Sequence, residues 1–186
     1  MPDPARIILL NGVGSAGKTS IARALQGIVG ECYLHVALDA FLEMLPASRF
    51  GHPDGYMFET VEQDGKPAVV IHTGPDFQRA MRGMRRAMAA LAAAGNNLIV
   101  DEVLLGGHEW EDYRAVLAPF QVFLIGVMAP LDVLEARERA RGDRDIGLAR
   151  WQFDRVHRGL RYDLEVDTST ASPLACAEAI KAAFGL

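Results

Sequence analysis

The stretch Gly12-Val13-Gly14-Ser15-Ala16-Gly17-Lys18-Thr19 decides how this chain folds. It has the form G-x-x-x-x-G-K-T, follows the apolar run 7–10 and precedes a helical pattern that starts at Ser20. In such a loop between a strand and a helix, backbone N–H groups point into one concavity that holds a polyphosphate. The lysine reaches the β- and γ-phosphates, and the threonine hydroxyl can bind Mg²⁺. A glycine-rich turn with a surface lysine is the alternative, but the flanking strand and helix favour a phosphate-binding loop that extends to Ser20.

The composition indicates one packed domain over residues 1–186, because 50% of the residues are hydrophobic and only 23% are charged. The net charge of −5 argues against nucleic acid as a partner, since such proteins need an excess of Lys and Arg. Arginines nevertheless gather in the last third: Arg137, Arg139, Arg141, Arg144, Arg150, Arg155, Arg158 and Arg161. In a chain with a phosphate loop, we expect this cluster to face nucleotide phosphates.

Cysteine and histidine usage supports neither a disulfide framework nor a zinc site. Cys32 and Cys176 are far apart, and the five histidines are scattered without ligand spacing. The first predicted strand begins within seven residues of Met1, so we expect no signal peptide. No apolar run approaches the roughly 18 residues of a membrane span. We therefore expect a cytoplasmic protein without a membrane partner.

Apolar runs of strand length alternate with helical patterns along the chain. The predicted strands cover residues 6–11, 32–38, 97–103, 121–127 and 164–166. The predicted helices cover residues 18–29, 75–94, 109–117, 131–140, 147–159 and 173–184. Nearly continuous hydrophobic strands that alternate with helices are typical of parallel strands covered on both faces. The sequence thus predicts an α/β three-layer sandwich of the P-loop NTPase type, with a five-stranded parallel sheet.

One segment departs from this alternation. Residues 46–74 are rich in Gly, Pro and Asp, and they contain Asp64-Gly65 between two extended segments. Asp-Gly in that position is typical of a β-hairpin turn. Because this insertion follows the second strand, we expect it to overhang the side of the sheet where an acceptor would bind.

Asp39 follows the apolar stretch Val36-Ala37-Leu38, at the expected carboxyl edge of the sheet. That edge faces the ligand crevice in open α/β sheets. A carboxylate there could take the proton of an acceptor hydroxyl while a phosphoryl group is transferred. The residues equally allow Asp39 to be the N-cap of a helix over 40–45. The phosphate loop favours the catalytic interpretation.

Asp101 follows the apolar strand Leu98-Ile99-Val100 in the arrangement of a Walker-B aspartate. Together with Thr19, its carboxylate is predicted to bind Mg²⁺ beside the phosphate loop. Many buried strands end in Asp, so the interpretation depends on the phosphate loop upstream. Glu102 comes next, but alternation along the strand directs it to the other face.

The segment 137–150 is predicted to form an arginine-bearing lid. Arg137 and Arg141 are four residues apart and share a helix face, and Arg144 follows the turn that Gly142 allows. We predict that Arg141 and Arg144 stabilise charge on the moving phosphoryl group, and that Arg137 contacts the nucleotide. The alternative is a solvated basic helix end paired with nearby acidic residues, which are Glu135, Glu138 and Asp143.

In combination, these motifs resemble the chloramphenicol phosphotransferase family, P-loop kinases that phosphorylate the primary hydroxyl of that antibiotic. The resemblance spans nearly the whole chain. It is carried by residues 8–12, 15–19, 36–39, 98–103, 105–107, 137–144 and 162–168. Val13-Gly14 departs from the family, which tends to have Gly followed by a small hydroxyl residue at this point.

The resemblance implies that ATP is the phosphate donor, that Mg²⁺ is the cofactor and that Asp39 deprotonates the acceptor hydroxyl. It implies that Lys18 and Arg144 hold phosphate oxygens. It also implies that the loop after Val166, which contains Thr168, lies near the adenine. The implied acceptor is a small hydroxylated molecule, either chloramphenicol or a related antibiotic.

Two other functions stay open on the residues alone. A zeta-toxin-like kinase also pairs a phosphate loop with an early acidic base, although its nucleotide-sugar acceptor would need a larger acceptor region. A non-catalytic nucleotide-dependent regulator is the second alternative. A GTPase would need an N-K-x-D motif, which is absent. A nucleoside monophosphate kinase would need more acceptor-side cations than Arg49 and Lys66.

Overall fold

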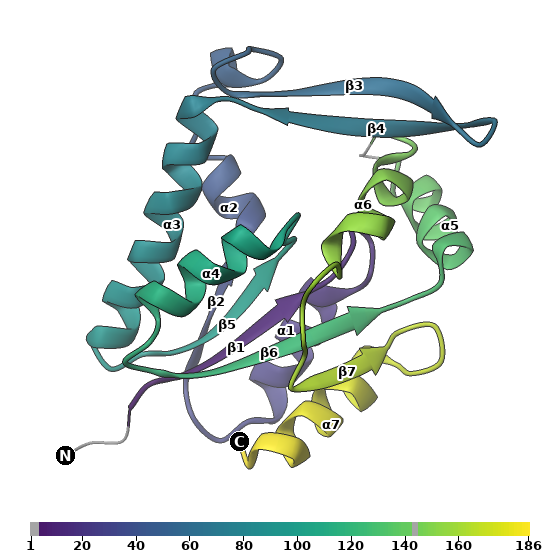
Figure 1. Cartoon of the computed structure of the whole chain (residues 1–186). Helices are drawn as coiled ribbons and strands as arrows, with labels where there is room; N and C mark the ends of the chain where they lie inside the picture. Colours follow the sequence, from purple (N-terminus) through teal and green to yellow (C-terminus); the bar gives the residue numbers. More distant parts are fainter. Residues whose placement is uncertain (1–3, 143–144) are drawn as a thin grey trace.

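A parallel five-stranded sheet forms the centre of the computed structural model, which describes residues 4–142 and 145–186 (Figure 1). The strand order is β2-β5-β1-β6-β7. The bounds of these strands are β1 (Arg6–Asn11), β2 (Tyr33–Ala37), β5 (Asn97–Glu102), β6 (Gln121–Met128) and β7 (Leu164–Asp167). All four pairings between neighbouring strands are parallel. The predicted five-stranded parallel sheet is confirmed.

Helices cover both faces of this sheet, because its central strands are apolar on both sides. In β1, Ile8 and Leu10 point into one core and Ile7 and Leu9 into the other, and all four are fully buried. The first core contains residues of α1 (Lys18–Ile28), α5 (Leu131–Arg141), α6 (Leu148–Val156) and α7 (Pro173–Phe184). The second contains residues of α2 (Leu38–Leu42), α3 (Pro75–Ala93) and α4 (Gly107–Val116). The result is the predicted three-layer arrangement.

The methionines of α3 belong to this second core. Met81, Met84 and Met88 are buried at helical spacing, so they pack against the sheet. None of the helices in the described ranges combines the length and the apolar character needed to cross a bilayer.

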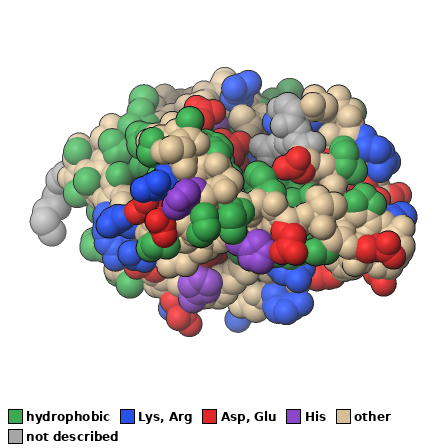
Figure 2. Space-filling view, turned by 90° about the horizontal axis from the view of Figure 1, so that it is seen from above, with side chains coloured by type: hydrophobic (Ala, Val, Ile, Leu, Met, Phe, Trp, Pro, Cys, Tyr) green, Lys and Arg blue, Asp and Glu red, His purple; other side chains and the backbone are tan. Residues whose placement is uncertain are grey.

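The insertion after β2 forms the predicted hairpin. Its antiparallel strands are β3 (Tyr56–Gln63) and β4 (Lys66–Thr73), and a short 3₁₀ helix (Ala47–Arg49) precedes them. The turn residues Asp64 and Gly65 have φ angles of 53° and 72°, as a tight hairpin turn requires. The hairpin pairs with no strand of the main sheet and crosses the molecule from α3 to α5 and α6 (Figure 1). Figure 2 views the molecule from above and shows histidine side chains next to acidic ones. Within the hairpin, His72 Nε2 lies 2.7 Å from Glu59 Oε2.

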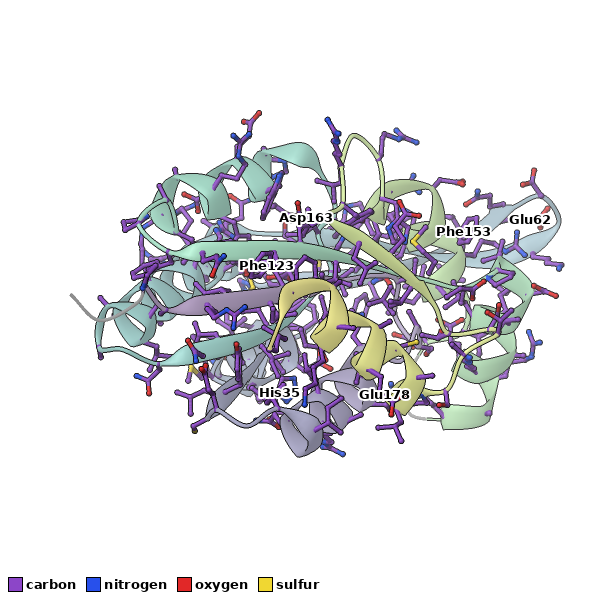
Figure 3. All side chains as sticks on the ribbon, turned by 90° about the horizontal axis from the view of Figure 1, so that it is seen from below. His35, Glu62, Phe123, Phe153, Asp163 and Glu178 are labelled. Carbon is purple, nitrogen blue, oxygen red and sulfur yellow. The ribbon has the colours of Figure 1, made fainter. Side chains whose placement is uncertain are left out.

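The far end of the hairpin is attached to the start of α6. The Val69 N–H donates to the Gly147 carbonyl at 3.0 Å, and Lys66 lies 3.8 Å from Glu135 of α5. Phe153 of α6 and Glu62 of the hairpin lie at the same end of the molecule (Figure 3). The hairpin is therefore held at the tip as well as at its base, where the Gly74 N–H donates to the Gly55 carbonyl at 2.7 Å.

One boundary differs from the prediction in a way that affects the site. The strand before Asp39 ends at Ala37, and α2 begins at Leu38. Leu38 packs into the second core from this helix, which explains why the apolar stretch looked like a longer strand. Asp39 consequently lies in the first turn of α2 rather than at the end of a strand, and the N-cap position belongs to Ala37.

We predict that Gly147→Ala lowers the free energy of unfolding by about 2–5 kcal/mol. Gly147 has a φ angle of 108°, and a Cβ there would lie 2.5 Å from the Pro67 carbonyl oxygen of the hairpin. Gly65→Ala is the matched control, because Gly65 has a φ of 72° but no atom within 4 Å of an added Cβ. It should cost only the backbone strain, about 1–2 kcal/mol. Equal losses in urea unfolding would show that the hairpin does not press against α6.

Candidate active site

The phosphate loop lies between β1 and α1, at the centre of the sheet. Its first residue, Gly12, packs against β6 so closely that a Cβ would lie 2.6 Å from the Val127 carbonyl oxygen. No acidic residue occupies the first turn of α1, so the positive end of this helix is left for an anion. A glycine at this position and an open helix N-terminus are both needed for a backbone cradle around phosphate.

Lys18 reaches back over this loop. Its Nζ donates to the carbonyl oxygens of Gly12 at 2.9 Å and Val13 at 3.1 Å, and it lies 3.9 Å from Asp101 Oδ1. The side chain is buried. The ammonium group is thus held inside the loop, where it can transfer its hydrogen bonds to phosphate oxygens.

Thr19 and Asp101 form the oxygen pair predicted for magnesium. The Thr19 hydroxyl donates to Asp101 Oδ2 at 2.6 Å. Burial alone would raise the pKa of Asp101, but His35, Lys18 and Thr19 outweigh burial and lower it, so this carboxylate is ionised at neutral pH. In the described part of the chain no group of three or more His, Cys, Asp or Glu side chains could hold a metal. Two protein oxygens completed by phosphate oxygens and water suit Mg²⁺, which is usually bound in this way.

One cavity of about 380 Å³ brings most of the predicted site residues together. It extends from the phosphate loop to the first turn of α2 and to α5. The predicted residues that line it are Gly14, Ser15, Gly17, Lys18, Thr19, Ser20, Asp39, Asp101, Arg137, Arg141 and Thr168. Gly12, Val13 and Ala16 do not line it and support the loop from behind, with Val13 and Ala16 buried in the core. Arg144 lies outside the described residues.

Arg137 joins the phosphate loop to the segment after β7. Its guanidinium donates to the Thr168 hydroxyl at 2.9 Å and to the Thr168 carbonyl at 2.6 Å. The Thr168 hydroxyl in turn donates to the Ala16 carbonyl at 2.9 Å. Ala171 and Pro173 follow Thr168 along the same cavity wall. Apolar groups beside a guanidinium plane offer a surface on which a nucleotide base can lie.

The two described acidic residues near the end of α5, Glu135 and Glu138, have specific partners. Glu138 is only 2% exposed, and its carboxylate accepts the N–H groups of Gly147 and Ala149, each at 2.8 Å. Glu138 therefore caps the start of α6 and is not part of a solvated helix end. Glu135 does form ion pairs, with Arg150 and Lys66.

Sequence reasoning missed three further residues around the cavity. His35 had looked like one of several scattered histidines, yet its Nε2 is buried 3.7 Å from Asp101 Oδ2. Gln152 of α6 is buried, and its Oε1 accepts the Gly14 N–H at 2.7 Å. Tyr56 at the base of the hairpin lies close enough to Asp39 that burial and then the Asp39 charge raise its pKa. No local spacing marks these residues, because each meets its partner only in the folded chain.

Three aromatic rings surround Tyr56 at the base of the hairpin. The ring centroids of Phe50, Phe58 and Phe77 lie 4.9, 5.5 and 5.7 Å from that of Tyr56. Phe58 is nevertheless 47% exposed, although it shares a hairpin face with Tyr56. Arg49, one of the two cations considered in the sequence analysis, lies just before the hairpin. Its Nε is 2.6 Å from Asp76 Oδ2.

Glu102 points away from the cavity, as alternation predicted. It is buried, and it accepts the Tyr113 hydroxyl at 2.5 Å and the Val103 N–H at 2.9 Å. Burial outweighs these bonds and raises the pKa of Glu102 to about 7. Its role is therefore to join β5 to α4 behind the site.

Comparison with known proteins agrees with this geometry. The model of the family described as chloramphenicol phosphotransferase-like proteins matches residues 5–185. The chain belongs to this family. A Mycobacterium tuberculosis H37Rv protein named "Putative O-phosphotransferase Rv2636" is 36% identical over 179 residues, which cover 94% of this chain and 79% of that protein. The family resemblance is confirmed, and the chain is a phosphotransferase of the kinase type.

Solved structures share the fold at low identity. A sugar kinase from Janibacter sp. HTCC2649 is 20% identical with a TM-score of 0.68, covering 98% of this chain and 95% of that chain. The Mycobacterium tuberculosis APS kinase CysC, in complex with AMPPNP and APS, is 16% identical with a TM-score of 0.69, and the match covers both chains completely. At these identities the likeness shows the P-loop kinase fold alone.

We predict that Glu102→Gln removes a pH-dependent loss of stability. A carboxyl whose pKa rises from 4.5 to about 7 on folding keeps its proton in the folded state. The contribution of Glu102 to the free energy of unfolding is therefore fully present below pH 4.5, and about 3 kcal/mol of it is lost as the pH rises to 7. Urea unfolding at about pH 5 and pH 8 should show a smaller pH difference in the variant than in the original protein. The exposed Glu62→Gln is the control, and an equal effect of both substitutions would contradict the assignment.

Proposed function

We propose that this protein transfers the γ-phosphate of ATP to a hydroxyl group of a small molecule, with chloramphenicol or a related hydroxylated antibiotic as the leading acceptor. The single observation that carries the proposal is that one cavity is lined both by the phosphate loop and by Asp39. A donor phosphate and an acidic base in the same cavity are the two requirements for phosphorylating an alcohol. Family membership supports the same reaction.

In this proposal each cavity residue has a separate task. The loop N–H groups and Lys18 bind phosphate oxygens, and Arg141 stabilises the charge of the phosphoryl group in flight. Asp39 accepts the proton of the acceptor hydroxyl as its oxygen attacks phosphorus. Thr19 and Asp101 would hold Mg²⁺, which neutralises phosphate charge when bound.

We assign the lid role to the segment 137–150, with Arg144 as a further phosphate ligand and Arg137 beside the nucleotide base. Thr168 and the segment after it would contact the adenine. The whole chain then acts as one kinase domain, with residues 46–74 as the acceptor-side insertion. Its need for ATP suits an enzyme of the cytoplasm.

The surroundings of Tyr56 support an uncharged acceptor with an apolar part. Aromatic rings offer contact area to such a molecule, whereas a phosphorylated or sulfated acceptor needs cations. Arg49 is paired with Asp76, so its guanidinium is not left to bind an anionic acceptor. This observation disfavours a nucleotide-sugar or nucleotide acceptor.

The reaction can be tested directly. Purified protein, ATP, Mg²⁺ and chloramphenicol should yield ADP together with a product that is heavier by one phosphoryl group in mass spectrometry. A panel of other hydroxylated antibiotics tests the acceptor separately from the chemistry. Absence of acceptor-dependent ADP formation across the panel would count against an antibiotic kinase.

We predict that Asp39→Asn lowers kcat by roughly 10²–10⁴-fold, because the amide cannot accept the proton of the acceptor hydroxyl. The affinity for Mg·ATP should stay nearly unchanged, since in this proposal Asp39 faces the acceptor and not the phosphates. Both quantities can be measured by a coupled ADP assay and by isothermal titration calorimetry.

Lys18→Ala provides the contrast to this substitution. It should weaken nucleotide binding as well as turnover, because the ammonium group would contact phosphate in the ground state and the transition state. If Asp39→Asn turned over acceptor at the original rate, Asp39 would not be the base.

A further inference from the structure

The peptide unit between Val13 and Gly14 is held from both sides. On one side, the Val13 carbonyl accepts Lys18 Nζ at 3.1 Å and the Ala16 N–H at 3.1 Å. On the other, the Gly14 N–H donates to Gln152 Oε1 at 2.7 Å. These contacts determine which way this peptide plane faces, and Gly14 itself lines the cavity.

The contribution of Gln152 grows when Lys18 changes partner. If Lys18 binds phosphate as proposed above, it gives up its bonds to the Gly12 and Val13 carbonyls. The peptide plane is then held by the Ala16 N–H and by Gln152. A glycine next to this plane resists rotation poorly, because it lacks a Cβ. A buried acceptor on the Gly14 N–H is therefore what keeps the first half of the loop open for phosphate.

Gln152 is itself placed by contacts at both ends of α6. Glu138 accepts the N–H groups of Gly147 and Ala149 at the start of this helix. The Asn11 side chain donates to the Val156 carbonyl at its end, at 2.9 Å. Gln152 is 4% exposed, so its side chain has little freedom to leave the loop. An uncharged amide also suits this position, because a carboxylate would lie beside the phosphates.

We propose that Gln152 is a positioning residue for nucleotide binding: from α6 it fixes the Val13–Gly14 peptide plane, so that the phosphate loop is shaped before the nucleotide arrives. This inference rests on the proposed function, in which the loop binds the phosphates of ATP. Gln152 touches the loop and not the reacting atoms. The hairpin is also attached to the start of α6, because the Val69 N–H donates to the Gly147 carbonyl. The phosphate loop and the hairpin are therefore attached to the same helix.

The test uses two substitutions and two ligands. Gln152→Met keeps the length of the side chain but leaves the Gly14 N–H without its acceptor. It should raise the Kd for Mg·ADP by about 5- to 100-fold, which corresponds to a buried donor left unpaired. The Kd for AMP should change much less, because AMP lacks the β-phosphate that the loop concavity would bind. Isothermal titration calorimetry measures both constants, and thermal unfolding checks that each variant is folded.

Gln152→Glu keeps an acceptor for the Gly14 N–H but adds a negative charge. It should weaken Mg·ADP binding by about ten-fold or more, and the weakening should grow with pH as the new carboxyl ionises. A purely structural role would not depend on pH or on the number of phosphates in the ligand. This variant also keeps the proposal testable if Gln152→Met does not fold.

Gln26→Met is the matched control. It makes the same chemical change and removes the bond from Gln26 Nε2 to the Tyr33 carbonyl, near the end of α1 that is remote from the phosphate loop. Its Kd for Mg·ADP should equal that of the original protein. If the original protein binds ADP and both Gln152 variants bind it equally well, the role of Gln152 is refuted. If the original protein binds no ADP or ATP, the proposed function itself is refuted.

Discussion

The close approach of the phosphate loop to β6 constrains the rest of the site. At Gly12 the loop passes so close to the Val127 carbonyl that no side chain fits at this position. The buried peptide groups of the loop must find partners nearby. Lys18 supplies some of these partners from α1. Gln152 and Thr168 supply others from segments about 140 and 150 residues further along the chain. The loop geometry therefore depends on α6 and on the segment after β7, both of which are folded onto it.

The strand order explains why the acidic residues meet this loop. Parallel strands bring their carboxyl ends to one edge of the sheet, and β5 lies between β1 and β2. In the register of the sheet, Asp101 is opposite Leu10 on one side and Ala37 on the other. Its carboxylate can thus reach Thr19 in the first turn of α1. Asp39 follows Ala37 by two residues, so the first turn of α2 carries it to the same edge.

Features encoded by local spacing could be predicted from the sequence. The phosphate loop, the Asp64-Gly65 turn and the aspartate at the end of β5 all depend on neighbours in the chain, and the structure contains each of them. The start of α2 was predicted less well, because Leu38 packs in the core whether it belongs to a strand or a helix. The pattern of apolar residues indicates that Leu38 is buried, but burial alone does not distinguish a strand from a helix.

Residues that act through long-range contacts could not be found in this way. Glu138 lies in an arginine-rich helix, and only the return of the chain at Gly147 buries its carboxylate under α6. His35 becomes a neighbour of Asp101 only when β2 pairs with β5. Gln152 has no motif at all, because an amide that accepts one backbone N–H can occur on any buried helix face. Such residues need the strand order and helix placement before they can be recognised.

The attachment of the hairpin has a consequence for catalysis in a phosphotransferase of this kind. A two-stranded hairpin alone is only marginally stable in water, and this one pairs with no strand of the main sheet. Its base is held at Gly55 and Gly74, and its far part is held by Gly147 at the start of α6. Gln152 also attaches the phosphate loop to α6. In the proposed function the hairpin covers the acceptor and the loop binds the donor phosphate, so both would share one support. Phosphoryl transfer needs the attacking oxygen aligned with phosphorus to within a fraction of an ångström, and a shared support reduces the relative motion that would spoil this alignment.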